Sequence, residues 1–252
     1  MPSTILIVGA SSGIGKETAL TFAKNNWKVV VCSRNLKKLK DLADFSSKNF
    51  KKKILPYKLD ITKSDKLKLN INRIIRETGL PDIVFLNAGT NNPNSKNIVN
   101  NKQTKKLFET NFFGIIHCTE IFLPYLRKIQ NSQLVIMSSV AGYRGLPYAA
   151  AYCSTKAALI AFAESIYNQC KAVGIQVRII CPGFVKTPLT DKNNFKMPMI
   201  ISAKLAGQII YAKLTNSRDF EIVFPKLFGF VMKVLKHLPN SLYLKLTSRL
   251  LK

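Results

Sequence analysis

The chain is poor in acidic side chains. Its 252 residues include 13 aspartates and glutamates against 39 lysines and arginines, a formal net charge of +26. Such an excess predicts attraction to phosphate groups, whether these belong to nucleotides, nucleic acid or anionic lipid. Lysine, asparagine and isoleucine are abundant throughout. AT-rich coding would produce the same bias, so a purely compositional origin of the diffuse charge stays open.

Metal-binding residues are also scarce. Two histidines, and five cysteines that form no CxxC pair, argue against a metal site built from these residues, and no metal is expected. The odd number of cysteines predicts reduced, buried thiols. No aromatic residues interleave with the basic runs, so nucleic acid is the weakest candidate partner. An apolar run begins at Thr4, which leaves no room for a signal peptide and predicts a cytoplasmic protein.

Short apolar runs alternate with helical patterns along the chain. Strands are expected at residues 4–8, 28–32, 54–59, 83–86, 134–137, 176–181 and 220–224. Helices are expected after the first strand, at 35–48 and 64–78, up to about 129, at 149–173, and from Ser202 to about 214. Such alternation predicts a parallel sheet with right-handed crossovers. We therefore expect the α/β class: a single Rossmann-like doubly wound domain over residues 1–225, with a seven-stranded parallel sheet flanked by helices on both faces.

The first strand leads directly into the glycine-rich turn GASSGIG at residues 9–15, and a helical pattern follows. A strand, a glycine turn and a helix N-terminus together form a cradle for dinucleotide phosphates, because glycines admit the pyrophosphate and the helix start offers unpaired N–H groups. The spacing is G-x-x-x-G-x-G rather than the commoner G-x-G-x-x-G. The position between strand and helix is what favours cofactor binding over an ordinary turn.

The most informative spacing joins Ser139, Tyr152 and Lys156. Positions 152 and 156 share one face of a helix, so a lysine ammonium beside the phenol is expected to lower the phenol's pKa. A hydroxyl from Ser139 at a neighbouring strand end would hold a carbonyl oxygen against that phenol. The pattern predicts a proton donor, an electrostatic tuner and a substrate clamp at one place. An ordinary helix tyrosine beside a lysine is the alternative.

These motifs resemble the short-chain dehydrogenase/reductase family, and the resemblance runs from about Thr4 to Phe224. It implies a helix asparagine that holds a proton-relay water, at Asn111. The catalytic residues expected are Asn111, Ser139, Tyr152 and Lys156. The residues expected to bind the cofactor are Gly9, Ser11, Ser12, Gly13, Ile14, Gly15, Arg34, Asp60, Ile61, Asn87, Ala88, Gly89, Tyr152, Lys156, Pro182, Gly183, Val185 and Thr187.

Several of these positions have specific roles in the family. The resemblance implies that Asp60 lies near the adenine ring, that residues 87–89 steady the central sheet beside the cofactor, and that residues 182–187 grip the nicotinamide. Two positions depart from the family pattern: Val8 replaces the usual threonine, and Leu86 replaces the first asparagine of NNAG. These departures affect local hydrogen bonding rather than the chemistry.

The end of the second strand predicts the cofactor. In a Rossmann fold an acid about twenty residues past the glycine turn binds the ribose 2′-hydroxyl of NAD. Here the strand ends in Cys32-Ser33-Arg34, without a carboxylate. Arg34 offers a planar, charged fork suited to a 2′-phosphate, so we predict NADP(H). A solvated arginine at a strand end is the alternative.

The predicted function is hydride transfer between NADP(H) and a carbonyl or alcohol substrate, with Tyr152 as general acid and base. The apolar stretch from Leu189 to Ile201 is expected to cover the substrate and favours a lipophilic ketone or aldehyde. A non-catalytic membrane-surface or anion-binding protein on the same scaffold is the alternative function. The resemblance implies a homodimer or homotetramer formed through the long helices.

Residues 226–252 form a basic, amphipathic C-terminal extension with six lysines or arginines and no acid. Phe228, Val231, Met232 and Leu235 lie on one helical stripe, Pro239 breaks the pattern, and Leu242, Leu246 and Leu250 form a second stripe. Both stretches are shorter than the ~20 residues that span a bilayer. Peripheral contact with an anionic membrane, a lid on a lipophilic pocket, packing on the protein's own core and packing on a sister subunit all stay open.

Overall fold

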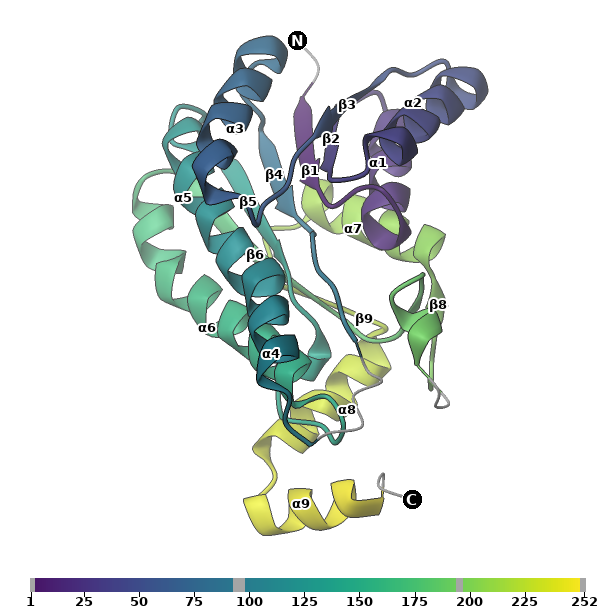
Figure 1. Ribbon diagram of the computed structural model, residues 1–252, viewed down its shortest axis with the longest axis vertical. Coiled ribbons are helices and arrows are strands. Elements are labelled where there is room, and N and C mark those ends of the chain that lie inside the picture. The colour runs from purple at the N-terminus through teal and green to yellow at the C-terminus, as the bar shows by residue number, and fades with distance from the viewer. Residues whose placement is uncertain (1–2, 93–97, 194–196, 250–252) are drawn as a thin grey trace.

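The computed structural model of the chain describes residues 3–92, 98–193 and 197–249. Its main sheet has the strand order β3-β2-β1-β4-β5-β6-β9 (Figure 1). All neighbouring strands in it are parallel. The strands are β1 (Thr4–Val8), β2 (Lys28–Ser33), β3 (Ile54–Lys58), β4 (Ile83–Leu86), β5 (Ser132–Met137), β6 (Ile175–Pro182) and β9 (Glu221–Phe224). The predicted seven-stranded parallel sheet is confirmed.

Helices cover both faces of the sheet (Figure 1). One face carries α1 (Gly13–Lys24), α2 (Leu36–Phe50) and α7 (Ala203–Asn216). The other carries α3 (Ser64–Thr78), α4 (Asn101–Phe108), α5 (Gly114–Leu126) and α6 (Ala150–Ala172). Side chains alternate between the two layers along a strand, so Ile5 and Ile7 of β1 enter one core while Leu6 and Val8 enter the other. The doubly wound α/β class is therefore confirmed.

Most predicted ends lie within two residues of the observed ones, a difference that fraying explains. The long helix before β5 is the exception. A π-helical segment, Glu109–Phe113, joins α4 to α5 and carries Asn111. Periodicity cannot separate such a segment from an α-helix, although π turns occur frequently at functional sites. Residues 93–97, before α4, lie outside the described residues.

Two short strands stand apart from the main sheet. β7 (Val185–Lys186) pairs with β8 (Ile201–Ser202), and this pairing brings together the two ends of the segment between β6 and α7. The Ser202 side chain accepts a hydrogen bond from the Leu205 amide, so Ser202, where the helix was expected to begin, is the N-cap of α7. Residues 194–196 of this segment are outside the described residues.

The C-terminal extension forms two helices, α8 (Lys226–His237) and α9 (Asn240–Ser248), with Pro239 between them. The predicted first stripe is divided, because Phe228, Met232 and Leu235 pack against the core while Val231 is exposed. Leu242 and Leu246 are exposed as well, and Leu250 lies outside the described residues. Among the described residues, no helix combines the length and apolar character needed to cross a bilayer.

A buried arginine ties the end of α7 to the sheet. Arg178 on β6 has no solvent exposure. Its guanidinium donates to the Asp219 and Lys213 carbonyls at 2.9 and 3.0 Å. It also donates to the Gln133 and Ser217 side chains at 3.2 and 3.0 Å. Burial lowers the Arg178 pKa to about 10, so the side chain stays charged at neutral pH and satisfies four oxygens in this corner.

Replacing Arg178 with alanine is expected to lower the free energy of unfolding by about 3 kcal/mol, because several buried oxygens lose their donor. Urea denaturation followed by circular dichroism measures the change. Arg218→Ala is the matched control, because Arg218 is exposed and its guanidinium contacts the Gln176 side chain. Equal effects of the two substitutions would show that the buried hydrogen bonds of Arg178 add no more to the free energy of unfolding than an exposed arginine does.

Candidate active site

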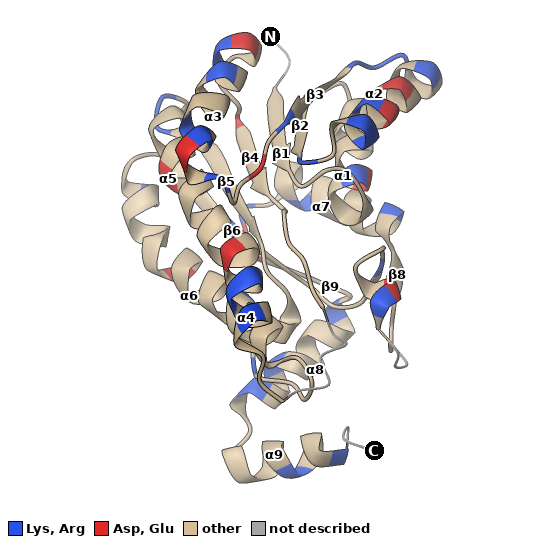
Figure 2. Cartoon of the chain, in the orientation of Figure 1, with Lys and Arg blue, Asp and Glu red and all other residues tan. Residues whose placement is uncertain are grey.

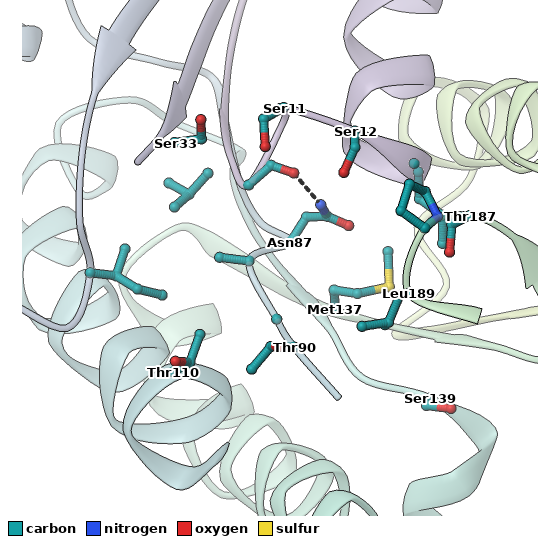
Figure 3. A pocket seen from close by; sticks show the side chains of 18 of the residues that line it. Ser11, Ser12, Ser33, Asn87, Thr90, Thr110, Met137, Ser139, Thr187 and Leu189 are labelled. Atoms are coloured by element: carbon teal, nitrogen blue, oxygen red, sulfur yellow. Dashed lines mark hydrogen bonds between the residues drawn. The ribbon is translucent and has the colours of Figure 1, made fainter. Parts of the chain in front are cut away.

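A cavity of about 310 Å³ opens at the carboxyl edge of the sheet. The loops after β1, β2, β3, β4, β5 and β6 all contribute to its lining (Figure 3). From β1 the chain winds through β2 to β3 on one side, and it continues with β4 on the other side. The cavity thus lies at the topological switch point, where ligands bind in open α/β sheets.

The glycine turn after β1 is held against the end of β4. Gly9 has φ of +95°, and a Cβ there would lie 2.6 Å from Ala88 Cα. Asn87 Nδ2 donates to the Gly9 carbonyl at 2.7 Å, the bond drawn in Figure 3. Ser12 is the N-cap of α1, but its side chain makes no capping hydrogen bond. The amides of the first turn of α1 therefore keep the anion-binding character of a helix N-terminus.

Arg34 and Asp60 mark one end of the cavity. Arg34 is exposed at the end of β2, and its sequence neighbours Ser33 and Asn35 also line the cavity, so the end of β2 itself offers no carboxylate. Burial acts to raise the pKa of Asp60, but hydrogen bonds from Thr62 and the charge of Arg34 outweigh it and lower that pKa. The Thr62 amide and hydroxyl donate to Asp60 Oδ1 at 3.0 and 2.8 Å.

Ser139, Tyr152 and Lys156 line the other end of the same cavity. The Ser139 side chain lies near enough to the Tyr152 phenol to influence its pKa, and its Oγ donates to the Pro182 carbonyl at 3.3 Å. Ser139 follows β5, where its Oγ accepts from the Ala141 amide at 3.1 Å. Lys156 is buried on α6, and its Nζ donates to the Met137 carbonyl at 3.0 Å. The predicted convergence of the three side chains is present.

The electrostatics differ from the prediction at Tyr152. Burial raises the Tyr152 pKa to about 12, although the Ser139 side chain opposes this rise. The expected lowering by Lys156 is therefore wrong. Burial also lowers the Lys156 pKa to about 8, and its Nζ lies 5.7 Å from the centre of the tyrosine ring. The ammonium thus faces the Met137 carbonyl and does not compensate the desolvation of the phenol.

Asn111 lies behind the cavity wall rather than in it. Both amide hydrogens of its side chain are used, by the Thr90 carbonyl at 2.9 Å and the Thr155 hydroxyl at 3.2 Å. Its Oδ1 accepts from the Thr90 amide at 2.7 Å. The side chain thereby fixes the segment that leaves β4 against α6, and neighbouring Thr90 and Thr110 reach the cavity instead.

The C-terminal extension packs tightly against the loop after β6. A Cβ on Gly183 would lie 2.5 Å from the Phe228 ring of α8, so only glycine fits there. The Phe184 and Phe228 rings are 5.5 Å apart. The Gly183 amide donates to the Phe224 carbonyl at 2.8 Å. Pro182, Gly183, Val185 and Thr187 all line the cavity.

Two predicted residues do not line the cavity, Asn111 and Gly15. A Cβ on Gly15 would lie 2.4 Å from the Gly9 carbonyl oxygen, so this glycine allows α1 to approach the turn. The other predicted residues line it. Leu189 and Thr190, from the stretch expected to cover the substrate, line it as well. Lining residues that sequence analysis did not identify are Val8, Ser33, Asn35, Leu59, Thr62, Thr90, Thr110, Met137, Ser138 and Pro188. Their only sequence signal was adjacency to predicted positions.

Cysteines and metal ligands take no part in this site. All five cysteines are buried and free. Within the described residues, no three histidine, cysteine, aspartate or glutamate side chains gather closely enough to hold a metal ion.

Comparison with known proteins identifies the class. A family model described as short chain dehydrogenase matches residues 3–197. An uncharacterized oxidoreductase of Myxococcus xanthus is 33% identical over 240 residues, covering 95% of this chain and 94% of that protein. Human 17-beta-hydroxysteroid dehydrogenase 13 is 28% identical over 240 residues, covering 94% and 79%. The solved structure of ElxO with NADP bound superposes with a TM-score of 0.78 at 27% identity, covering 88% and 97%. The chain belongs to the short-chain dehydrogenase family and is an oxidoreductase.

The lowered pKa of Lys156 is open to direct measurement. In protein carrying ¹³C-labelled lysine, one Cε resonance is expected to titrate near pH 8, charged below and neutral above, because burial disfavours the ammonium. That resonance should be missing from the Lys156→Met variant. A spectrum in which every lysine stays charged up to pH 10 would contradict the inferred desolvation.

Proposed function

We propose that the protein reduces a lipophilic ketone or aldehyde with NADPH, using Tyr152 as the proton donor. One observation carries this proposal: Ser139, Tyr152 and Lys156 line the same cavity as the N-terminus of α1 and Arg34. Membership of an oxidoreductase family disfavours the alternative of a non-catalytic anion-binding protein.

The residues that line the cavity fit this cofactor. The first turn of α1, without a side-chain cap, suits the pyrophosphate. Arg34, with no carboxylate at its own strand end, suits a 2′-phosphate, and ElxO, a structural relative, has NADP bound. Residues 182–187 and Lys156 would hold the nicotinamide and its ribose. When bound, NADPH supplies a hydride to the carbonyl carbon of the substrate.

The roles of the catalytic side chains follow from their protonation. With a pKa raised to about 12, Tyr152 is protonated at neutral pH and donates its proton to the carbonyl oxygen as that oxygen gains charge. Ser139 hydrogen-bonds the same oxygen and keeps it beside the phenol. Lys156, with a pKa near 8, carries most of its positive charge at pH 7, and its Nζ, anchored on the Met137 carbonyl, is the group that would hold the nicotinamide ribose beside the phenol.

Asn111 acts in this scheme as a positioning residue. Its side chain holds Thr90 and Thr155, which keeps the end of β4 fixed against α6 beside Lys156. A relay water that reprotonates Tyr152 would then be held by the main chain of the π-helical segment rather than by the Asn111 amide.

The substrate class follows from the cover of the cavity. Leu189 lines it, while Met199 and Ile200 of the same segment are exposed. An apolar cover favours a lipophilic carbonyl compound, and one relative carries the name of a hydroxysteroid dehydrogenase. A raised tyrosine pKa favours reduction over oxidation, because oxidation needs the phenolate as its base. Assembly as a homodimer or homotetramer is part of the same proposal and rests on the family resemblance.

Replacing Tyr152 with phenylalanine is expected to lower kcat by at least about 100-fold, because the proton donor is lost while the ring remains. NADPH oxidation at 340 nm against a ketone panel measures turnover, and fluorescence titration measures NADPH binding, which should change less than about threefold. Tyr148→Phe is the control, since Tyr148 is exposed in the segment before α6. Undiminished turnover in Tyr152→Phe would refute the assignment.

Replacing Arg34 with alanine is expected to reduce the preference for NADPH over NADH by roughly 10- to 100-fold, the effect of losing charge-assisted hydrogen bonds to one phosphate. The ratio of kcat/KM for the two cofactors gives the preference. Lys37→Ala is the matched control, because Lys37 is exposed near the same strand end but does not line the cavity. Equal use of both cofactors by the unmodified protein would contradict the prediction.

A further inference from the structure

Helix α8 has a second apolar face that the core does not cover. Leu227, Phe230, Val231 and Val234 follow the spacing i, i+3, i+4, i+7 and are all exposed, Phe230 by 65%. The core-facing Phe228, Met232 and Leu235 lie on a different side of the same helix. A surface helix of a globular protein normally has one apolar stripe, so the second stripe requires a separate explanation.

Helix α9 extends this apolar surface. Leu242, Leu244 and Leu246 are exposed, Leu244 by 64%, and Tyr243 is the buried residue of this helix. Leu242 and Leu246 lie on one flank of Tyr243 and Leu244 lies on the other. These three leucines and the four exposed residues of α8 are together called the C-terminal apolar face below. Together they form a larger set of exposed apolar side chains than scattered surface residues would provide.

The turn between the two helices is fixed by Arg144. Its Nη1 donates to the carbonyls of Leu235 and Leu238 at 3.0 and 2.6 Å, which caps the end of α8. Its guanidinium also stacks on the Tyr243 ring at 4.1 Å, and the Tyr243 hydroxyl donates to the Gly145 carbonyl at 2.6 Å. Helix α9 is therefore held in place while its leucines stay in solvent.

Other exposed apolar side chains lie at the same edge of the sheet. Ile98 and Val99 follow β4, Tyr148 follows β5, and Met199 and Ile200 follow β6. With the C-terminal apolar face after β9, these account for twelve of the seventeen large hydrophobic residues exposed in the described part of the chain. Strands β4, β5, β6 and β9 are adjacent and parallel, and α8 and α9 lie beyond their carboxyl ends, the edge at which the cavity opens (Figure 1).

The charge around this face indicates the kind of partner. Residues 226–249 contain basic side chains and no acid, and Figure 2 shows blue but no red on α8 and α9. In a symmetric dimer built on this face, the same basic surface would oppose itself, and the chain already carries +26. Repulsion therefore disfavours a second copy, whereas an anionic surface complements both the charge and the apolar residues.

We propose that the C-terminal apolar face docks on the surface of an anionic phospholipid bilayer. The apolar side chains would enter the headgroup region while Lys226, Lys236, Lys245 and Arg249 contact lipid phosphates, the mode of a basic amphipathic helix. Docking this edge turns the cavity mouth toward the lipid. The orientation lets a lipophilic carbonyl compound enter from the bilayer, a consequence that rests on the proposed function.

The test is co-sedimentation of the full chain with vesicles. Vesicles of phosphatidylcholine with phosphatidylserine are compared with vesicles of phosphatidylcholine alone, at low and at high salt. The unmodified protein should bind the anionic vesicles at low salt and lose binding as salt rises. Phe230→Ser with Leu244→Ser, and separately Lys245→Gln with Arg249→Gln, should each lower the partition coefficient roughly tenfold or more.

Matched controls lie on α3, apart from α8 and α9 (Figure 1). Leu69→Ser removes a leucine that is 72% exposed, and Lys66→Gln with Lys68→Gln removes two exposed charges. These variants should bind vesicles like the unmodified protein. Equal losses in both sets, or unchanged binding in the α8–α9 variants, would overturn the proposal. So would a dimer, detected by analytical ultracentrifugation, that dissociates in Phe230→Ser with Leu244→Ser while vesicle binding stays constant.

Activity separates this proposal from the proposed function. The Phe230→Ser, Leu244→Ser variant should reduce a water-soluble ketone at the normal rate. Its rate on a long-chain ketone carried in anionic vesicles should fall roughly tenfold, matching its lost binding. Vesicle binding without turnover of either ketone would refute the reductase assignment alone. Turnover of both ketones without vesicle binding would refute the docking alone.

Discussion

The close approach of α6 to the end of β5 is the constraint on which the candidate site depends. The Ser138 hydroxyl donates to the Lys156 carbonyl at 2.9 Å, and Lys156 Nζ returns to the Met137 carbonyl at 3.0 Å. A Cβ on Gly142 would lie 2.7 Å from the Lys156 carbonyl carbon, so the turn after β5 needs glycine there. These contacts bring Ser139 beside Tyr152, and they also bury the Lys156 amine and the Tyr152 phenol. The same packing therefore causes both the proximity of the three side chains and the shifted pKa values of Tyr152 and Lys156.

Sequence analysis predicted the structural features that depend on residue spacing. It missed the properties that depend on how deeply a side chain is buried in the folded protein. The seven parallel strands, the glycine turn and the i, i+4 relation of Tyr152 and Lys156 follow from periodicity and residue spacing. The Tyr152 pKa does not, because its direction depends on how much water the folded site excludes. The exposure of Val231 also could not be predicted from the sequence, because an apolar stripe on a helix does not show which other elements cover it.

The two departures from the family pattern turn out to be a single local change. Val8 and Leu86 are partners in the register between β1 and β4, and both lie in the same buried cluster. Two apolar side chains therefore meet where the family has polar ones. The Gly9 carbonyl is still satisfied, because Asn87 Nδ2 reaches it. Because both side chains are apolar in this chain, neither one leaves a buried polar group without a partner there.

The contact of Phe228 with Gly183 joins two regions that the sequence alone would treat as separate modules. The ring occupies the space that any side chain at position 183 would need. If the last 27 residues are exchanged for those of a relative, the new segment must therefore have a residue at position 228 that fits against Gly183. A chimera that brings a smaller one leaves a void beneath the loop at 182–187, and one that replaces the glycine cannot seat α8 at all. The terminal helices and this loop can diversify only as a pair.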